Sequence, residues 1–262
     1  MTIELLSQDD TRWDCVSLGE VMLRLDPGFG RVRTARTFAV HEGGGEYNVA
    51  RAMSKVFGMR SAAVTALVDN EIGRLVEDLM MAGGVELDHV CWVPFDGLGF
   101  TRVGLNFTEK GFGIRPPLGV SDRANSAASK MAPGDVDWNR LFAEEGARWF
   151  HTGGIFSGLS ETCAELALEG MQAARSAGTV VSYDVNLRSS LWREPGRDPV
   201  AVNRRMLEHV DVTFGSIADY RTGLGFEIED RPVEEWIDEP DGFAALAEAV
   251  RTEFPQVQVV AM

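Results

Sequence analysis

The stretch SAAVTALVDNEIGRLVEDLMMA, residues 61–82, joins an apolar run to an amphipathic segment through two polar residues. Residues 61–67 form a short apolar run bounded by polar residues, which predicts a buried strand. Apolar residues then recur at helical spacing, at Ile72, Leu75, Val76, Leu79 and Met80. Asp69 and Asn70 stand where the cap of a helix beginning near Glu71 is expected. The stretch therefore predicts one strand followed by one helix.

The same alternation runs along most of the 262 residues. Further strands are predicted at 15–20, 147–152, 179–185, 210–214 and 257–262. Further helical stripes of apolar residues cover 49–57 and 243–254. Strands that alternate with helices are typical of a parallel sheet with crossover helices, so the sequence predicts an α/β fold.

Two segments, residues 22–41 and 99–125, interrupt this alternation. Within the second, Val103, Leu105 and Phe107 alternate with polar residues or glycine at period two. This period is typical of a sheet with one exposed face, so we expect the two segments to pair as a small antiparallel sheet, forming a second layer or a lid.

Composition excludes several classes of partner. The 40 acidic and 25 basic residues give a formal net charge of -15, which disfavours nucleic acid and anionic membranes. Three widely spaced cysteines indicate neither a disulfide framework nor a zinc site. No apolar run approaches the ~20 residues that span a bilayer, and the polar N-terminus differs from a signal peptide. We expect a soluble, cytoplasmic protein.

Polar residues follow the predicted strands, where ligands of open α/β sheets bind. They are Glu20, Asp69, Gly153, Gly154, Asp184, Asn186, Arg188, Ser216 and Asp219. Such a set suits a polyhydroxylated, anionic or metal-chelated ligand. Helix capping is the alternative for Asp69, and a solvated first-turn acid is the alternative for Asp219. Asp184, Asn186 and Arg188 alternate in SYDVNLRSSLW (182–192), so we expect them to point the same way.

The run HEGGGEYNVAR (41–51) places three glycines before a helical pattern. Gly43, Gly45 and Asn48 nearly match the G-x-G-x-x-G pattern of nicotinamide dehydrogenases. The match fails because Asn48 replaces the third glycine, RTFAVH is not a buried strand, and the first strand ends without a glycine turn. A helix beginning at Asn48 behind a glycine loop instead allows backbone and amide groups to approach sugar hydroxyls.

The segments GGGEYNVARAMSKVFG (43–58) and VTALVDNEIGRLVEDLMMAGGVELDHV (64–90) resemble the N-terminal signature of the ribokinase-like, PfkB-type carbohydrate kinases. Four further segments resemble 2-dehydro-3-deoxygluconokinases: GLNFTEKGFGIR (104–115), SDRANSAASKMAPGDVDW (121–138), FHTGGIF (150–156) and SYDVNLRSSLW (182–192). The resemblance covers residues 14–262. It implies one doubly wound, mostly parallel α/β kinase domain, with residues 22–41 and 99–125 inserted as a small β lid.

The resemblance also implies an activity and assigns residues to it. ATP would donate its γ-phosphoryl group, with Mg²⁺, to a hydroxyl of 2-dehydro-3-deoxy-D-gluconate. Arg123 would pair with the carboxylate of the sugar acid, because a guanidinium can bond both of its oxygens. The substrate-binding set would be Gly44, Asn48, Asn106, Arg123 and Arg188. The nucleotide and Mg²⁺ side would be Asp184, Asn186, Ser216 and Asp219. The lid would also form the contact of a homodimer.

The chain departs from the family pattern at three places. Ser121 and Asp122 precede Arg123, where relatives often carry a tyrosine, and GSIAD (215–219) keeps only Ser216 and Asp219 of the nucleotide-side motif. The resemblance also implies a Gly-Ala-Gly-Asp loop that would supply an anion hole and a catalytic base. This loop does not occur in the sequence. We expect it C-terminal to Met262 and expect no turnover without it. We interpret the similar APGD around Asp135 as a turn and helix cap.

A sugar-acid kinase is thus the leading hypothesis. A kinase of the same family for fructose or a nucleoside is the first alternative. A sugar-binding module without catalysis is the second.

Overall fold

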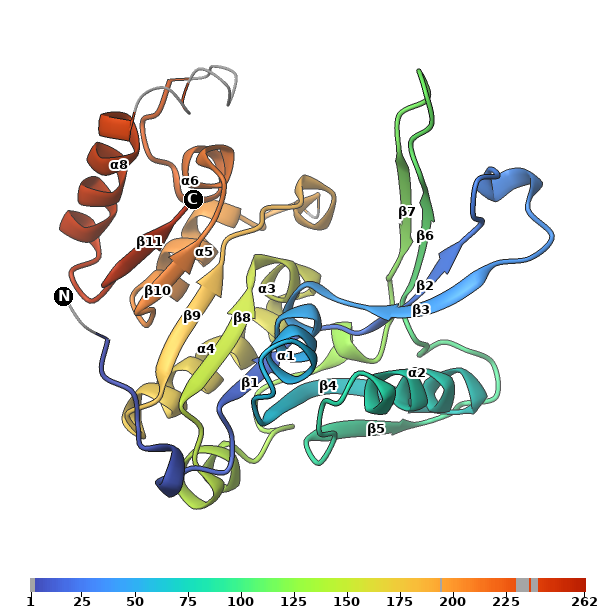
Figure 1. The fold of residues 1–262 in the computed structure, drawn as a ribbon, viewed down its shortest axis with the longest axis horizontal. Helices are drawn as coiled ribbons and strands as arrows, with labels where there is room; N and C mark the ends of the chain where they lie inside the picture. Colours follow the sequence, from blue (N-terminus) through green and yellow to red (C-terminus); the bar gives the residue numbers. More distant parts are fainter. Residues whose placement is uncertain (1–2, 194, 230–235, 237–239) are drawn as a thin grey trace. The chain divides into compact units, whose positions relative to one another are not determined.

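The computed structural model describes residues 3–193, 195–229, 236 and 240–262. The chain divides into two compact units (Figure 1). Residues Cys15–Val136 form the middle unit, and Met1–Asp14 with Asp137–Met262 form the outer unit. Within the described ranges, no helix combines the length and apolar character that crossing a membrane requires.

Three parallel strands of the middle unit lie side by side in the order β1 (Cys15–Leu18), β4 (Ser61–Asp69) and β5 (Val90–Pro94). The first eight residues of β4 are buried, which explains its apolar sequence. Asn70 caps α2 (Glu71–Ala82), because its side chain accepts hydrogen bonds from the amides of Ile72 and Gly73. The predicted strand and capped helix of residues 61–82 are confirmed. Strand β5 was not predicted, because it is short and only half-buried.

Helix α1 (Gly45–Lys55) also belongs to the middle unit. Its Tyr47 and Ala50 pack with Val76 and Met80 of α2 and Leu67 of β4 in one apolar core. The helix begins at Gly45, so the predicted start at Asn48 is wrong. Of the three glycines, Gly43 ends β3 (Ala39–Gly43), Gly44 is the N-cap of α1, and Gly45 is the first residue of the helix.

Four strands form a second sheet in the order β3 (Ala39–Gly43), β2 (Met22–Asp26), β6 (Leu105–Glu109) and β7 (Leu118–Asp122). Both hairpin pairs, β2 with β3 and β6 with β7, are antiparallel. The central pair, β2 with β6, is parallel, which corrects the expectation of a purely antiparallel sheet. Strands β4 and β5 and helix α2 intervene between β3 and β6, so no tight turn forces β6 to run antiparallel to β2.

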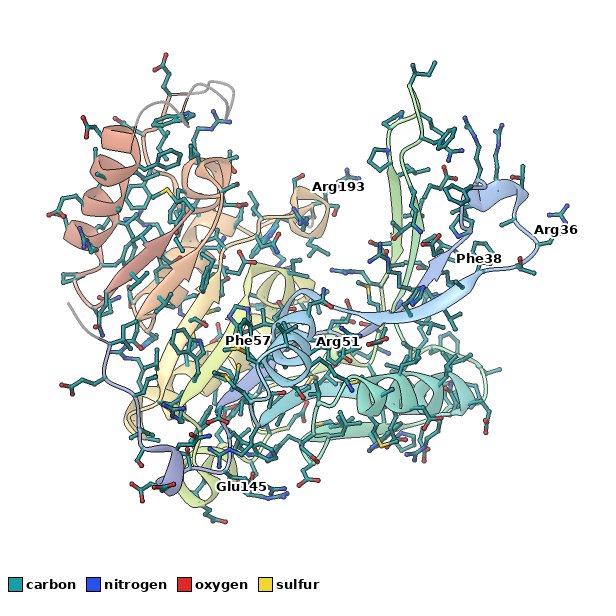
Figure 2. All side chains as sticks on the ribbon, in the orientation of Figure 1. Arg36, Phe38, Arg51, Phe57, Glu145 and Arg193 are labelled. Atoms are coloured by element: carbon teal, nitrogen blue, oxygen red, sulfur yellow. The ribbon has the colours of Figure 1, made fainter. Side chains whose placement is uncertain are left out.

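The register of this sheet separates an apolar face from a polar one, because residues paired directly across neighbouring strands share a face. One row across the four strands is Val40, Leu25, Phe107 and Val120. The next row, on the opposite face, is His41, Arg24, Asn106 and Ser121. Phe38, labelled in Figure 2, meets Phe107 edge to face with ring centroids 5.8 Å apart.

The outer unit holds four parallel strands in the order β8 (Trp149–Gly153), β9 (Val180–Asp184), β10 (Val212–Phe214) and β11 (Val259–Ala261). Its helices are α3 (Gly154–Leu159), α4 (Glu161–Ser176), α5 (Pro199–Leu207), α6 (Ile217–Leu224) and α8 (Pro240–Glu253). Residues Asn139–Glu145 form a short π-helix, and short 3₁₀ turns occupy Gln8–Asp10, Val32–Thr34, Ala128–Lys130 and Ser189–Trp192. Every strand predicted in this unit is present, and the α/β class is confirmed.

Candidate active site

The predicted site residues fall into two sets. Gly44, Asn48, Asn106 and Arg123 belong to the middle unit, and Asp184, Asn186, Arg188, Ser216 and Asp219 belong to the outer unit. Each set is described within its own unit.

Gly44 explains why the glycine run needs at least one residue without a side chain. It is the N-cap of α1 and has an extended backbone. A Cβ atom built on Gly44 would lie 1.9 Å from the carbonyl oxygen of Glu20, which is closer than any side chain permits. A Cβ at neighbouring Gly43 would meet nothing within 4 Å. The close approach at Gly44 is therefore to the protein's own backbone after β1.

Asn48 lies in the first turn of α1, where its amide donates to the Gly44 carbonyl at 2.9 Å. Its side chain is exposed. The helix is tied to β3 by Glu42, which accepts from Arg51 Nε at 3.0 Å and from the Tyr47 hydroxyl at 3.1 Å. Arg51 is labelled in Figure 2. These contacts fix the first turn of α1 beside the end of β3.

Asn106 stands in the polar row of the four-stranded sheet. Its amide nitrogen donates to Ser121 Oγ at 2.9 Å, and its amide oxygen accepts from Thr108 Oγ1 at 2.6 Å. Arg24 and His41 lie in the same row and were not among the predicted site residues. The alternation in VMLRLD (21–26), with Arg24 between two leucines, was the signal that could have identified Arg24.

Arg123 follows β7, and its side chain is only 15% exposed. Its Nε lies 3.3 Å from Oε2 of Glu20, whose side chain is 2% exposed. Its Nη2 lies 3.0 Å from the sulfur of Met22. Burial raises the pKa of the Glu20 carboxyl, and Arg123 and Ser126 oppose that rise. The sequence placed Glu20 at the end of the first strand but did not pair it with Arg123.

Asp184, Asn186 and Arg188 lie close together, but not for the reason predicted. Strand β9 ends at Asp184, and Asn186 has a positive φ of 32°, so the strand alternation does not extend through the three residues. Asn186 Nδ2 instead turns back and donates to Asp184 Oδ2 at 3.1 Å. Burial raises the pKa of the Asp184 carboxyl, and the nearby Arg188 lowers it.

Ser216 and Asp219 form a capping box at the start of α6. Asp219 Oδ2 accepts from the Ser216 amide at 2.8 Å and from its hydroxyl at 2.6 Å. Asp219 Oδ1 accepts from the Leu187 amide at 2.8 Å, so this acid also holds the segment after β9. Its contacts are those of a helix cap, whereas the alternative that the sequence left open for Asp219 was a solvated first-turn acid.

The other strand-end residues make structural contacts. Asp69 pairs with Arg74 at 2.7 Å, while the cap of α2 is Asn70. A Cβ at Gly154 would lie 2.1 Å from the Val185 carbonyl oxygen, which repeats the arrangement of Gly44.

No group of three or more acidic, histidine or cysteine side chains suited to a metal ion occurs within the described part of the chain. Mg²⁺ in kinases is often held by one or two carboxylates together with substrate phosphates. Asp184 fits such a partial role, because one carboxylate oxygen accepts from Asn186 and its half-buried position favours a cationic partner.

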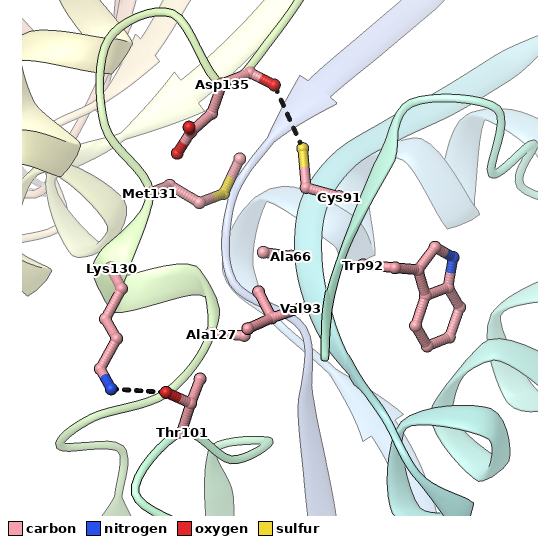
Figure 3. A pocket seen from close by; sticks show the side chains of 9 residues that line it. All are labelled: Ala66, Cys91, Trp92, Val93, Thr101, Ala127, Lys130, Met131 and Asp135. Atoms are coloured by element: carbon pink, nitrogen blue, oxygen red, sulfur yellow. Dashed lines mark hydrogen bonds between the residues drawn. The ribbon is translucent and has the colours of Figure 1, made fainter. Parts of the chain in front are cut away.

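A cavity of about 210 Å³ lies beside β5 in the middle unit (Figure 3). Cys91 donates to the Asp135 carbonyl at 3.5 Å, and Lys130 donates to Thr101 Oγ1 at 2.6 Å. The Asp135 carboxylate accepts from the Ala132 amide at 2.8 Å, closing a turn. The APGD segment is therefore a turn, as predicted. The cap before residue 140 is made by Asp137, which accepts from the Arg140 amide.

Comparison with known proteins identifies relatives of this chain. The chain matches the pfkB family of carbohydrate kinases over residues 13–262. It is 36% identical over 213 residues to 2-dehydro-3-deoxygalactonokinase of Haloferax volcanii, which covers 80% of this chain and 63% of that enzyme. Fructokinase-2 of Solanum habrochaites is 32% identical over 183 residues, covering 68% of this chain and 51% of the relative.

Among solved structures, 2-dehydro-3-deoxygluconokinase of Thermotoga maritima matches with a TM-score of 0.81 and 31% identity. The match covers 92% of this chain and 69% of that one. The chain therefore spans 63% and 51% of the length of the two curated relatives.

Proposed function

Because the chain belongs to the PfkB family of carbohydrate kinases, we propose that it serves the transfer of the γ-phosphoryl group of ATP to a hydroxyl of a sugar acid. The substrate class is a 2-dehydro-3-deoxy aldonate, and 2-dehydro-3-deoxy-D-gluconate is the member we assign. Similarity to a gluconokinase and a galactonokinase of this kind supports the class. The ribokinase-like α/β fold is shared with the first of them, with a TM-score of 0.81.

Arg123 is the observation that carries the sugar-acid assignment. A guanidinium that is 15% exposed and makes one loose ion pair at 3.3 Å is poised to bond a planar carboxylate. In this proposal, Gly44 and Asn48 contact the sugar from the start of α1, and Asn106 contacts it from the polar face of the sheet. The four-stranded sheet acts as the lid.

The proposed nucleotide side lies in the outer unit. Asp184 and Asn186 face Mg²⁺-ATP, with Ser216 and Asp219 shaping the segment beside them. Mg²⁺ supplies charge neutralisation of the phosphates when it is bound. Asp219 acts by holding the Leu187 amide and the start of α6, since its oxygens accept three hydrogen bonds there.

Turnover in this proposal requires a Gly-Ala-Gly-Asp loop, which does not occur among the 262 residues. We therefore expect these residues to bind the sugar acid without phosphorylating it. Activity with the loop supplied and none without it would support this view. A kinase rate from the 262 residues alone would contradict it.

Replacing Arg123 with lysine tests the sugar-acid assignment, because lysine keeps the charge that Glu20 requires and loses the two-pronged donor geometry. We expect affinity for 2-dehydro-3-deoxy-D-gluconate, measured by calorimetry, to fall about 10-fold to 100-fold, as for a lost charged hydrogen bond. Affinity for D-fructose should not change. Arg102→Lys is the matched control, because Arg102 pairs with exposed Asp122 at 2.6 Å. Equal losses in both variants would refute the role of Arg123.

A fructokinase is the second candidate, favoured by the 32% identity to Fructokinase-2. Tighter binding of D-fructose than of the sugar acids would establish it. Binding of sugar that never leads to turnover, even with the Gly-Ala-Gly-Asp loop present, would instead favour a sugar-binding module.

The proposal places the protein in the cytoplasm as a homodimer that pairs through the four-stranded sheet. Val40, Leu118 and Val120 support the pairing, since each is between 38% and 50% exposed on the apolar face. Val120→Glu should then convert dimer to monomer in sedimentation. A wild-type chain that sediments as a monomer would contradict it.

A further inference from the structure

The buried ion pair of Glu20 and Arg123 joins the end of β1 to the segment after β7 within the middle unit. Only 2% of the Glu20 side chain and 15% of the Arg123 side chain are exposed. Within the described part of the chain, neither Glu20 oxygen nor Arg123 Nε makes a well-aligned hydrogen bond. The pair is thus held by charge in a desolvated place, without the geometry that makes a buried pair strong.

The Glu20 carboxylate is buried and closely packed. A Cβ built on Gly104 would lie 2.6 Å from Glu20 Oε1, so this glycine makes space for the carboxylate. The Ser126 hydroxyl and the Arg123 guanidinium face it from the segment after β7. Buried Glu46 of α1 contacts adjacent Gly19, and exposed His41 lies in the polar row of the sheet.

Arrival of a sugar-acid carboxylate at Arg123 changes the charge balance of this place. One guanidinium would then face two carboxylates, and the Glu20 side chain is only 2% exposed. Keeping two carboxylates ionised at one site costs free energy, so one of them takes up a proton. The carboxyl of the sugar acid lies next to a carbonyl group, which makes it a stronger acid than a glutamic acid side chain, whereas burial already disfavours the charge of Glu20.

We propose that Glu20 is a positioning residue that holds Arg123 in the sugar-free protein and takes up one proton from solvent when Arg123 bonds the carboxylate of a sugar acid. The inference rests on the sugar-acid function proposed above. Protonated Glu20 is neutral and remains an acceptor for Arg123, so the site keeps a net charge of zero. A neutral sugar brings no second carboxylate and leaves the ion pair unchanged.

The direction of the pH dependence follows from linkage. Binding raises the pKa of Glu20, which burial has already raised in the free protein. Between the free and bound pKa values, the complex holds one more proton than the free protein. Affinity for a sugar acid therefore falls as pH rises through that window, by up to about tenfold per pH unit.

Calorimetry of the purified protein with 2-dehydro-3-deoxy-D-gluconate measures this proton directly. Titrations at about pH 6, 7 and 8, in buffers that differ in ionisation enthalpy, give the number of protons taken up. We expect uptake approaching one proton per sugar acid, weaker affinity at the highest pH, and no uptake with D-fructose.

Glu20→Gln assigns the proton to this residue. Glutamine has nearly the same size and still offers an oxygen to Arg123, so uptake should disappear while affinity at about pH 8 stays equal or improves. His41→Gln is the matched control and should retain the uptake, because it removes the imidazole in the polar row of the sheet and leaves Glu20 in place.

Three results overturn the inference. Sugar-acid binding without proton uptake refutes Glu20 while leaving the proposed function standing. Uptake that persists in Glu20→Gln, or vanishes in His41→Gln, does the same. Failure of the sugar acid to bind the wild-type protein at any pH refutes the proposed function and the inference together. If Glu20→Gln does not fold, the wild-type uptake and the His41→Gln control decide the question.

Discussion

Glu20 in the middle unit and Asp219 in the outer unit are both acids beside strand ends, yet their oxygens are satisfied in opposite ways. Asp219 accepts three hydrogen bonds of 2.6 to 2.8 Å, two of them from backbone amides. Glu20 has one buried cation at 3.3 Å. A carboxylate whose oxygens accept hydrogen bonds from backbone amides holds a loop in place. A buried carboxylate paired with only one cation can lose that partner to a ligand.

Gly44→Ala is the variant with the largest expected effect, and it tests the packing of the middle unit around Glu20. The added methyl would lie 1.9 Å from the Glu20 carbonyl, so α1 or the segment carrying Glu20 must shift. We expect a loss of about 3 kcal/mol or more in the free energy of unfolding, measured with urea. Gly43→Ala is the control and should change stability by less than about 0.5 kcal/mol, since its methyl meets nothing within 4 Å. Similar losses in both variants would refute the steric account.

The pH dependence of stability should also differ between the two units, because each holds a buried group whose pKa is shifted in the opposite direction. Burial lowers the pKa of His151 in β8 from 6.5 to about 4 and raises the pKa of Glu20. The stability that neutral His151 contributes is present above pH 6.5 and is lost as pH falls toward 4. That shift corresponds to about 3 kcal/mol. Glu20 acts in the opposite direction, since its contribution is lost as pH rises through its folded pKa.

His151→Gln isolates the first of these contributions. Urea unfolding at several pH values between about 4 and 7 should show a smaller decline on acidification in the variant than in the wild type. Parallel declines in the two proteins would show that His151 does not titrate as its burial among Ser182 and Phe214 implies.

Asp219→Ala is expected to have a smaller effect than the variants above that test Gly44 and His151. It removes a capping box and the bond to the Leu187 amide, so we expect a loss of about 2 kcal/mol in unfolding free energy. Ser216→Ala removes the cap alone and should cost about 1 kcal/mol. If the two variants were equally stable, Asp219 would not hold the segment after β9, and its contrast with Glu20 would fail.

Patterning predicted β1, β4, β8, β9, β10 and β11 because each lies in a local apolar run. It missed β5, where half-burial weakens the apolar signal, and it placed the start of α1 three residues late. Patterning also did not predict the parallel pairing of β2 and β6, because that pairing depends on the elements between β3 and β6. Period-two alternation predicts a sheet face but not the direction of the neighbouring strand.

The candidate site shows the same division. The sequence identified Asp184, Asn186 and Arg188 as a group, but their proximity comes from a turn at Asn186 with positive φ, not from strand alternation. It identified Arg123 only through family resemblance, because nothing local distinguishes one arginine near a loop from another.

By itself, the sequence determined the α/β class, the cap at Asn70, the polar strand ends and the kinase family. The cap and the strand ends are encoded by neighbours within about one helical turn or one strand, and the class and the family follow from the order of such local patterns along the chain. Only the tertiary structure decided that Gly44 must lack a side chain, that Asp219 is saturated, and that Glu20 faces Arg123. Those facts join residues 24 to 103 positions apart in the chain, and burial and pairing at such separations are set by packing, which no local pattern carries.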